Sequence, residues 1–250
     1  MSSIQLIYKT NHMNKSTLEE IEQRFDADVE RFSDLNTSQA NTLDAVFNME
    51  LITDGIKKVY PNLKHLLDIG CGAGNYAIKT LMKTNNQVNV DLVDLSQNML
   101  DRAKQRVLEH TTGEVNIFKG DFRTVDLEAE KYDVIIATMV LHHLRDDQDW
   151  ESTFQKLYSL LKKGGSIWIL DMVEQSSPKM QELIYYDRYG DFLTQLKDRS
   201  YQEHVFAYIE KEDSPRPLVY QLNLLEKVGF KQVDVLHKNL CFASFVGFRK

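Results

Sequence analysis

The sequence predicts an α/β fold, a Rossmann-like doubly wound and mostly parallel seven-stranded sheet with an antiparallel edge strand. Short apolar segments alternate with helical segments from residue 65 to residue 171. This alternation is typical of parallel sheets that carry helices on both faces. A glycine-rich turn follows the first apolar segment, and polar or glycine residues follow the next ones. In open α/β sheets such strand ends form the edge at which ligands bind.

Helices are expected before the sheet. Residues 17–20 read Thr-Leu-Glu-Glu, a capping-box pattern, and the apolar residues that follow recur at helical spacing up to Phe32. A polar break at residues 34–39 precedes a second helix, predicted over residues 40–59 and stopped by Pro61. These helices either pack on the edge of the sheet or form a lid that excludes water from a ligand.

The run His-Leu-Leu-Asp-Ile-Gly-Cys-Gly-Ala-Gly at residues 65–74 is the most informative segment. Its first half is a buried strand, and its three glycines let the chain turn sharply and bring bare backbone against a ligand. A helix predicted over residues 75–81 would direct its first N–H groups at the same ligand. The dinucleotide fingerprint needs its last glycine one residue later than Gly74, so this spacing argues against NAD.

Carboxylates follow the next two strands. Asp94 closes the strand predicted over residues 88–93, in the place where doubly wound folds bind the ribose hydroxyls of an adenosine. The strand at residues 115–119 leads to Asp121 and Phe122. A carboxylate beside an aromatic ring suits the amino group and ring face of an adenine.

The later core segments continue the alternation of strand and helix. A fourth strand is predicted over residues 132–137, and a helix over residues 149–161. The Lys-Lys-Gly-Gly sequence at residues 162–165 is expected to end this helix through C-terminal glycine chemistry. A fifth strand is then expected over residues 166–171.

Beyond residue 171 the pattern changes. Helices are predicted over residues 178–197 and 200–210, and both are dense in tyrosine and phenylalanine. These aromatic rings either form a wall of a substrate pocket, with cation–π contact to a cationic ligand, or belong to the core and a homodimer interface. A helix that stops at Gly229 follows. Strands at residues 233–236 and 243–248 are expected to pair antiparallel at one edge.

Composition bounds the class of protein. The chain has 250 residues, of which 27% are charged and 42% hydrophobic, and a net charge of −7. These values are ordinary for a globular domain, and the acidic balance without a Lys/Arg block argues against direct binding of nucleic acid. No apolar stretch is long enough to span a membrane or to act as a signal peptide. Two distant cysteines, Cys71 and Cys241, fit a reducing compartment, so the cytoplasm is expected.

Five blocks of the sequence, in order, resemble the class I S-adenosylmethionine-dependent methyltransferases. They read LLDIGCGAGNYA, VDLVDLSQNML, KGDF, YDVIIATMVLHHL and LLKKGGSIWIL, and they cover residues 62–172. The resemblance implies S-adenosyl-L-methionine as cofactor and S-adenosyl-L-homocysteine as product. It implies these contacts: Asp68, Gly70, Gly72 and Gly74 at the methionine end, Asp94 at the ribose, Asp121 and Phe122 at the adenine, and Thr138 near the sulfonium. Further cofactor contacts are expected from Cys71, Leu95, Met99 and Gly120.

The resemblance also implies a domain organisation. We expect a single methyltransferase domain over residues 1–250. It would consist of an N-terminal helical cap at 15–60, a cofactor-binding core at 62–172, a helical substrate or dimer region at 173–230, and C-terminal strands at 231–250. The small-molecule substrate would then meet the third of these regions.

The C-terminal part resembles one subgroup, the carboxy-S-adenosylmethionine synthases, which make a carboxylated sulfonium from prephenate for the modification of the tRNA wobble uridine. The resemblance lies in the string DRSYQEHV at residues 198–205 and the tail LCFASFVGF at residues 240–248. It implies that Arg199 pairs with the added carboxylate of carboxy-S-adenosyl-L-methionine, a task that suits a guanidinium. The early helical segment lacks the Pro-Gly-Tyr turn of that subgroup. After the fourth strand, His142 and His143 replace the residues that are usual in the subgroup.

His143 is the candidate general base, because a neutral imidazole can take a proton from a hydroxyl or amine as the methyl is transferred. Proximity alone also drives many methyl transfers, in which case the histidine packs beneath the cofactor. No metal is expected, since no histidine and carboxylate cluster shows ligand spacing along the chain. Three functions therefore stay open: a methyltransferase acting on a small molecule, a synthase or user of the carboxylated cofactor, and a non-catalytic cofactor-binding module.

Overall fold

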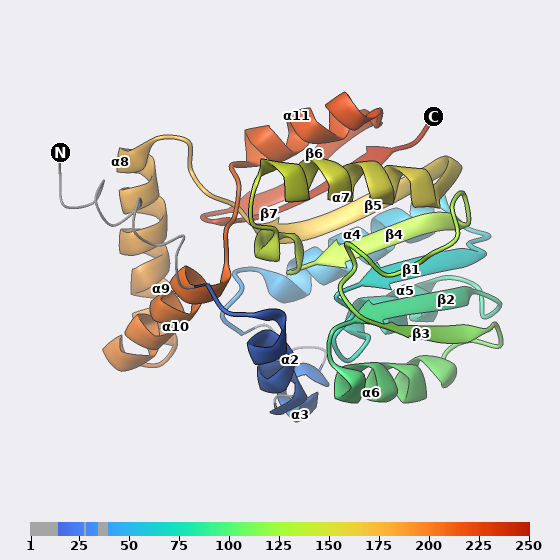
Figure 1. The fold of residues 1–250 in the computed structure, drawn as a ribbon, viewed down its shortest axis with the longest axis horizontal. Helices are drawn as coiled ribbons and strands as arrows, with labels where there is room; N and C mark the ends of the chain where they lie inside the picture. The colour runs from blue at the N-terminus through green and yellow to red at the C-terminus, as the bar shows by residue number, and fades with distance from the viewer. Residues whose placement is uncertain (1–14, 28, 35–39) are drawn as a thin grey trace.

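The computed structural model describes residues 15–27, 29–34 and 40–250. Its centre is a seven-stranded sheet in the order β3-β2-β1-β4-β5-β7-β6 (Figure 1). The strands are β1 His65–Ile69, β2 Asn89–Asp94, β3 Val115–Lys119, β4 Tyr132–Thr138, β5 Leu161–Met172, β6 Lys231–Asn239 and β7 Phe242–Phe248. The first five are parallel, and β7 runs antiparallel to both β5 and β6. The predicted fold class and the antiparallel pair at one edge are therefore confirmed.

Helices cover both faces of the sheet because neighbouring strand residues point to opposite sides. Leu66 of β1 belongs to the core under α4 Ala45–Val59, α5 Asn75–Lys83 and α6 Gln97–Leu108. The adjacent Leu67 belongs to the core under α7 Asp147–Leu160 and α11 Leu218–Val228. The strand order reverses between β1 and β4, and this reversal opens a crevice at their carboxyl ends.

A helical region extends beyond the sheet at that end (Figure 1). It consists of α8 Pro178–Gln181, a π-helical turn Glu182–Tyr189, α9 Gly190–Leu196 and α10 Arg199–Glu212. Its aromatic residues form a third core around Tyr185 and Tyr189, and Phe206 stacks on Tyr185 at 4.9 Å between ring centroids. The core interpretation of these rings is thus confirmed for several of them.

The N-terminal helices α2 Leu18–Ala27 and α3 Val29–Phe32 lie against α6. The predicted capping box is present at the start of α2. Thr17 N–H donates to Glu20 Oε2 at 2.9 Å, and Glu20 N–H donates to Thr17 Oγ1 at 3.2 Å. The second helix, α4, starts at Ala45 instead of residue 40, and residues 35–39 of the predicted polar break lie outside the described residues. Within the described chain no helix is long and apolar enough to cross a bilayer.

The expectation for the Lys-Lys-Gly-Gly sequence is wrong. Helix α7 ends at Leu160, and Leu161 is already extended and paired with Tyr132. The pairing then skips from Tyr132 with Leu161 to Val134 with Ser166, so residues 162–165 form an irregularity at the start of β5. Gly164 adopts a φ of +80° there, which explains the glycine.

Gly70 lies where the turn after β1 contacts the segment after β4. Its φ is +61°, and a Cβ on it would lie 2.4 Å from Val140 Cγ2, so the turn after β1 and the segment after β4 touch here. Glycine alone allows both the backbone conformation and the contact. This contact holds the two strand ends beside the crevice.

We predict that Gly70→Ala destabilises the protein more than Gly164→Ala does. Both glycines have positive φ, but a Cβ on Gly164 meets nothing within 4 Å. Backbone strain should therefore lower the free energy of unfolding of both variants by about 1 kcal/mol. Overpacking should lower that of Gly70→Ala by about 1–3 kcal/mol more. Urea unfolding of the three proteins measures the difference, and equal losses would contradict the close contact.

Candidate functional site

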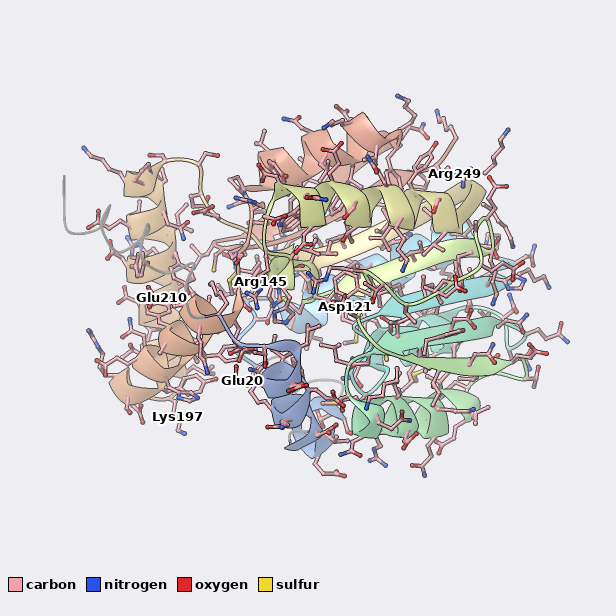
Figure 2. The ribbon with its side chains drawn as sticks, viewed as in Figure 1. Glu20, Asp121, Arg145, Lys197, Glu210 and Arg249 are labelled. Atoms are coloured by element: carbon pink, nitrogen blue, oxygen red, sulfur yellow. The ribbon has the colours of Figure 1, made fainter. Side chains whose placement is uncertain are left out.

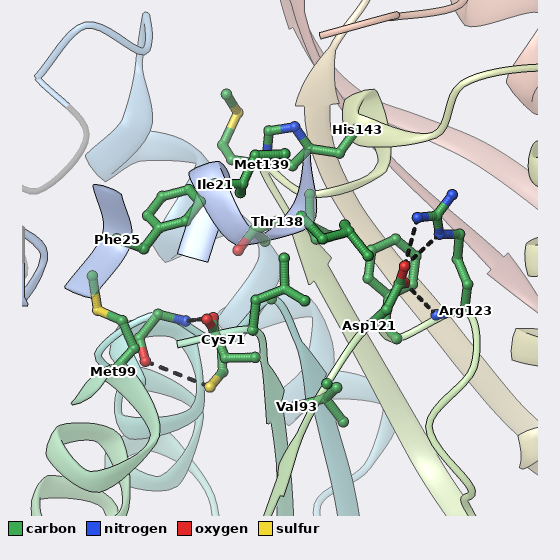
Figure 3. A pocket seen from close by; sticks show the side chains of 18 of the residues that line it. Ile21, Phe25, Cys71, Val93, Met99, Asp121, Arg123, Thr138, Met139 and His143 are labelled. Atoms are coloured by element: carbon green, nitrogen blue, oxygen red, sulfur yellow. Dashed lines mark hydrogen bonds and ion pairs between the residues drawn. The ribbon is translucent and has the colours of Figure 1, made fainter. Parts of the chain in front are cut away.

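A cavity of about 360 Å³ lies at the carboxyl ends of the parallel strands (Figure 3). Most of the residues predicted to bind a cofactor line it. They are Gly70, Cys71, Gly72, Asp94, Leu95, Met99, Gly120, Asp121, Phe122 and Thr138, together with the predicted base His143. The polar strand ends thus meet at one site, as expected for an open α/β sheet.

Two glycines form an open cradle in this cavity. Gly72 has a φ of +50° and Gly120 a φ of +147°, and a Cβ on either would meet no protein atom within 4 Å. Both face free space, so a bound group can approach the backbone closely. Gly74 differs, because a Cβ there would lie 3.2 Å from Ala103 Cβ and from Val107 Cγ2. Its predicted ligand contact is therefore not seen, and Gly74 serves the packing of α5 against α6.

Asp94 is half-buried at the tip of β2. Its Oδ2 accepts a hydrogen bond from Gly72 N–H at 2.9 Å, and its Oδ1 accepts one from Ser96 N–H at 2.9 Å. Burial raises the pKa of the Asp94 carboxyl to about 6, against the lowering effect of these backbone donors. Each carboxylate oxygen has a second lone pair, so Asp94 can still accept bonds from two ribose hydroxyls.

Asp68 is buried at the base of the glycine turn and does not line the cavity. Its Oδ2 atom has no hydrogen-bond partner in the described protein, and burial raises the pKa of its carboxyl to about 8. Buried polar atoms are normally paired, so this orphaned oxygen marks a place for an ordered water or a cationic ligand group. The predicted direct contact of Asp68 with a ligand is not visible in the cavity wall.

Asp121 is held in place by an arginine that the sequence did not single out. Arg123 Nε donates to Asp121 Oδ2 at 2.8 Å (Figure 3), and Arg123 Nη1 donates to Asp149 Oδ2 at 2.7 Å. The adjacent Phe122 ring is half-buried and lines the cavity. This arrangement presents an oriented carboxylate and a ring face side by side, as the adenine interpretation requires.

Helix α2 covers the cavity. Its residues Leu18, Ile21 and Phe25 line the wall opposite the glycine turn. The helix is joined to the end of α10 by an ion pair between Arg24 and Glu212. Sequence reasoning identified the helix and offered a lid as one interpretation, and the structure places it over the cavity.

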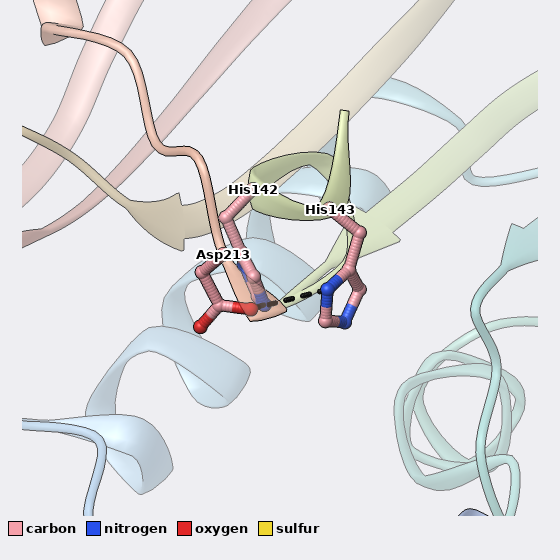
Figure 4. A group of neighbouring side chains, drawn as sticks. All are labelled: His142, His143 and Asp213. Atoms are coloured by element: carbon pink, nitrogen blue, oxygen red, sulfur yellow. Dashed lines mark ion pairs between the residues drawn. The ribbon is translucent and has the colours of Figure 1, made fainter. Parts of the chain in front are cut away.

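Two histidines and two carboxylates form a largely buried cluster beside the cavity, and Figure 4 shows three of its members, His142, His143 and Asp213. His142 Nδ1 contacts Asp171 Oδ1, and His142 Nε2 lies 3.7 Å from Asp213 Oδ1. His143 Nδ1 lies 3.1 Å from the same Asp213 oxygen. Asp171 and Asp213 were not identified from the sequence, because they are 29 and 71 residues from His142 along the chain and no local pattern connects them.

The two imidazoles are shifted in opposite directions. Burial lowers the pKa of His142, but the charges of Asp171 and Asp213 outweigh it and raise the pKa to about 9. The pKa of His143 is lowered, first by burial and then by the charge of His142. At neutral pH His142 is therefore protonated and His143 is neutral.

Arg199 does not reach the cavity. It is the first residue of α10, its side chain is 76% exposed, and its Nε donates to Glu203 Oε1 at 3.1 Å. The expected contact with a cofactor carboxylate is therefore wrong for a single chain. Asp198 caps this helix by accepting a hydrogen bond from Tyr201 N–H, and Arg199 lines neither cavity.

Comparisons with known proteins indicate a methyltransferase domain. Residues 66–165 match the family described as "Methyltransferase domain". The carboxy-S-adenosyl-L-methionine synthase of Nautilia profundicola is 24% identical over 81% of this chain and 84% of its own. The demethylmenaquinone methyltransferase of Alkalihalophilus pseudofirmus is 25% identical over 71% of this chain and 74% of its own.

Solved structures share the fold. Human N-acetylserotonin methyltransferase, solved in complex with S-adenosylmethionine, aligns over 97% of this chain and 65% of its own, with a TM-score of 0.58 and 18% identity. The PH0226 protein of Pyrococcus horikoshii aligns over 88% of this chain and 95% of its own, with a TM-score of 0.57 and 16% identity. The matched domain and these relatives support S-adenosylmethionine as the cofactor.

We predict that Asp94→Ala weakens the binding of S-adenosylhomocysteine by about 1.5–3 kcal/mol, because two ribose hydroxyls lose their acceptor. Isothermal titration measures the loss. NAD serves as the control ligand, and the wild type should not bind it with comparable affinity. An Asp94→Ala protein that binds like the wild type would contradict the ribose contact.

We also predict that cofactor affinity rises between pH 5 and pH 7. The pKa of Asp94 is raised from 3.8 to about 6, so its carboxyl holds the proton at pH 5 and has lost it at pH 7. Only the ionised form accepts from both hydroxyls, which gives a rise of about tenfold over this range. Asp94→Asn cannot ionise and should show a flatter profile in the same titration. The same slope in both proteins would assign the effect to another group.

Proposed function

We propose that this chain, which carries a class I S-adenosylmethionine-dependent methyltransferase domain, transfers the methyl group of its cofactor to a small molecule. The observation that carries the proposal is the position of His143 in the wall of the covered cavity. Helix α2 lies over this cavity, so a compact acceptor fits better than a macromolecule. The demethylmenaquinone methyltransferases among the relatives act, by their name, on a small molecule.

The residues of the cavity have separable tasks in this reaction. When bound, the cofactor supplies an electrophilic methyl group on a sulfonium. Gly72 and Gly120 leave room for it, Asp94 accepts from its ribose, and Asp121 with Phe122 holds its adenine. Ile21 and Phe25 of α2 exclude water from the reacting atoms, which prevents loss of the methyl group to hydrolysis.

His143 is placed to take the proton of the acceptor. Its Nδ1 faces Asp213, and Figure 4 shows the other ring nitrogen on the side away from that carboxylate. A proton on Nδ1 is stabilised by Asp213, which leaves Nε2 with a free lone pair. The lowered pKa of His143 keeps the ring neutral and able to accept. As the bond from acceptor to methyl forms and the bond from sulfur to methyl breaks, the acceptor proton passes to Nε2.

A proton on His142 supplies the positive charge beside Asp213. His142, His143 and Asp213 offer ligand atoms within 4.8 Å of one another, the spacing of a metal site. His142 already carries a proton at neutral pH, held between Asp171 and Asp213. We infer that this proton can balance the two carboxylates without a metal ion.

A second function is favoured by the relatives named carboxy-S-adenosyl-L-methionine synthase, which align over 81% of this chain. In that case the chain would make or use the carboxylated sulfonium. The exposed position of Arg199 and its pairing with Glu203 favour the ordinary methyltransferase.

We further propose that the enzyme works in the cytoplasm as a homodimer. Cys71 and Cys241 are both free and buried, which suits a reducing compartment. Met180 and Leu183 are large apolar residues that the helical region exposes, and they would form the contact between copies.

We predict that the protein moves the label of methyl-labelled S-adenosylmethionine onto a small molecule when it is incubated with the low-molecular-weight fraction of a cell extract. Mass spectrometry identifies the labelled product. His143→Ala should lower the turnover by about 10²- to 10⁴-fold, whereas His204→Ala, an exposed histidine, should leave it unchanged. Removal of metals with a chelator should also leave it unchanged. Label found only in macromolecules would overturn the proposal.

Arg199→Ala separates the two functions. For the methyltransferase we expect no change in the ratio of affinities for S-adenosylmethionine and its carboxylated form, because Arg199 is exposed. A selective loss of about 2–5 kcal/mol for the carboxylated form would instead support the synthase, since it reports an anion left unpaired. Titration of both sulfoniums against wild type and variant gives the ratio.

A further inference from the structure

A second cavity of about 360 Å³ adjoins the cofactor cavity on the side of the helical region. Its wall combines the end of β5, the π-helical turn and residues 213–216 after α10. Arg145 lines both cavities. In Figure 2 it lies between Glu210 on α10 and Asp121 at the end of β3.

Two cations of this cavity are held by neutral oxygens. Lys15 Nζ donates to the carbonyl oxygens of Glu210 and Asp213, both at 2.6 Å. Arg145 donates to the carbonyl oxygens of Glu212 and Ser16. Among the described residues neither cation forms an ion pair with a carboxylate, although the charge of Asp213 acts on both. The two charges also oppose each other, and Arg145 lowers the pKa of Lys15 next after burial does.

Arg216 adds a third cation with an unused donor. Its Nη2 pairs with Asp147 Oδ1 at 2.7 Å, but its Nε atom is buried and has no hydrogen-bond partner in the described protein. A buried donor without a partner is costly, so the site gains if a ligand supplies an acceptor.

The carboxylates around the cavity do not replace such a ligand. Asp213 is engaged with the two histidines, at 3.1 Å from His143 Nδ1. Glu210 is exposed to solvent, and Glu174 has interactions of its own. Three cations and three carboxylates thus line the cavity, and among the described residues none of these carboxylates forms an ion pair with Lys15, Arg145 or Arg216.

The remaining wall suits a planar ring. Tyr185 and Tyr186 meet edge to face at 5.0 Å between ring centroids. Met172, Val173 and Ile209 complete an apolar side. Aromatic and aliphatic surface opposite a cluster of cations is the pattern for an anion that carries a ring.

We propose that the second cavity binds the methyl acceptor and that this acceptor is a small organic anion with a planar ring, its anionic group held by Lys15, Arg145 and Arg216. This inference rests on the proposed function. Asp213 borders this cavity and lies next to His143 in the wall of the other, so an acceptor bound here presents its nucleophile at the junction beside Arg145. The cofactor cavity is then left entirely to the cofactor.

The test uses para-hydroxybenzoate as probe, with phenol as the matched ligand without the anion, and S-adenosylhomocysteine present to fill the first cavity. We expect para-hydroxybenzoate to bind about tenfold or more tightly than phenol. Lys15→Met and Arg216→Gln should each weaken the probe about tenfold, while Lys197→Met, a cation outside the cavity, should not. Titration of S-adenosylhomocysteine and thermal unfolding confirm that each variant is folded.

Equal binding of the probe and phenol, or unchanged binding in both Lys15→Met and Arg216→Gln, would overturn the inference. Inorganic phosphate that binds as tightly as the probe would also overturn it, because the site would then be a general anion site. A failure of this inference can be distinguished from a failure of the proposed function. Methyl transfer to small molecules without probe binding removes only this inference, whereas probe binding without any small-molecule product removes the proposed function.

Discussion

The contact between the turn after β1 and the segment after β4 is the constraint on which the site depends. At the switch point of a doubly wound sheet these two connections diverge to opposite faces, and the crevice between them receives the ligand. Their first residues must nevertheless be in contact, because this contact closes the base of the crevice. Gly70 against Val140 provides that touch, and Met139 adopts a φ of +53° as the chain leaves β4. The histidines follow directly, so the same contact determines where they lie.

Electrostatics divides the site into two halves. Around the glycine turn, burial holds carboxyls above their ordinary pKa, and the binding of a cationic, hydroxyl-rich cofactor favours their ionised form. Around the histidines, a buried imidazolium lies among carboxylates and keeps the neighbouring imidazole neutral. Asp94 and His143, whose pKa values are shifted in opposite directions, therefore line the same cavity, which is the arrangement expected of an active site.

Local patterns predicted the strands, the glycine turn and Asp94, because each of these depends on residues close together in sequence. The capping box predicted helix α2, but it could not predict which residues the helix contacts. Asp213 and Arg145 were missed, since they reach the site through packing across the chain, as in the bond from Lys15 to the carbonyl of Asp213, 198 residues away. Arg199 was misplaced because a resemblance of sequence carries no information on which way α10 turns its first residue. The Lys-Lys-Gly-Gly sequence failed for a related reason: strand pairing with Tyr132 outweighed the local signal for a helix end.

The attachment of α2 to the end of α10 also orders events during synthesis. Ser16 N–H donates to the carbonyl of Lys211 at 3.2 Å, and Arg24 pairs with Glu212. Ser16 and Arg24 are therefore synthesised long before the residues that they bind. The β1–β5 core can pair as it emerges, since chains fold progressively from the N-terminal side. The cover cannot close until residues 211–213 have left the ribosome. A nascent chain stalled before that point would hold a glycine turn open to solvent, and it would also lack β6 and β7, so the cavity closes only as the last two strands complete the sheet.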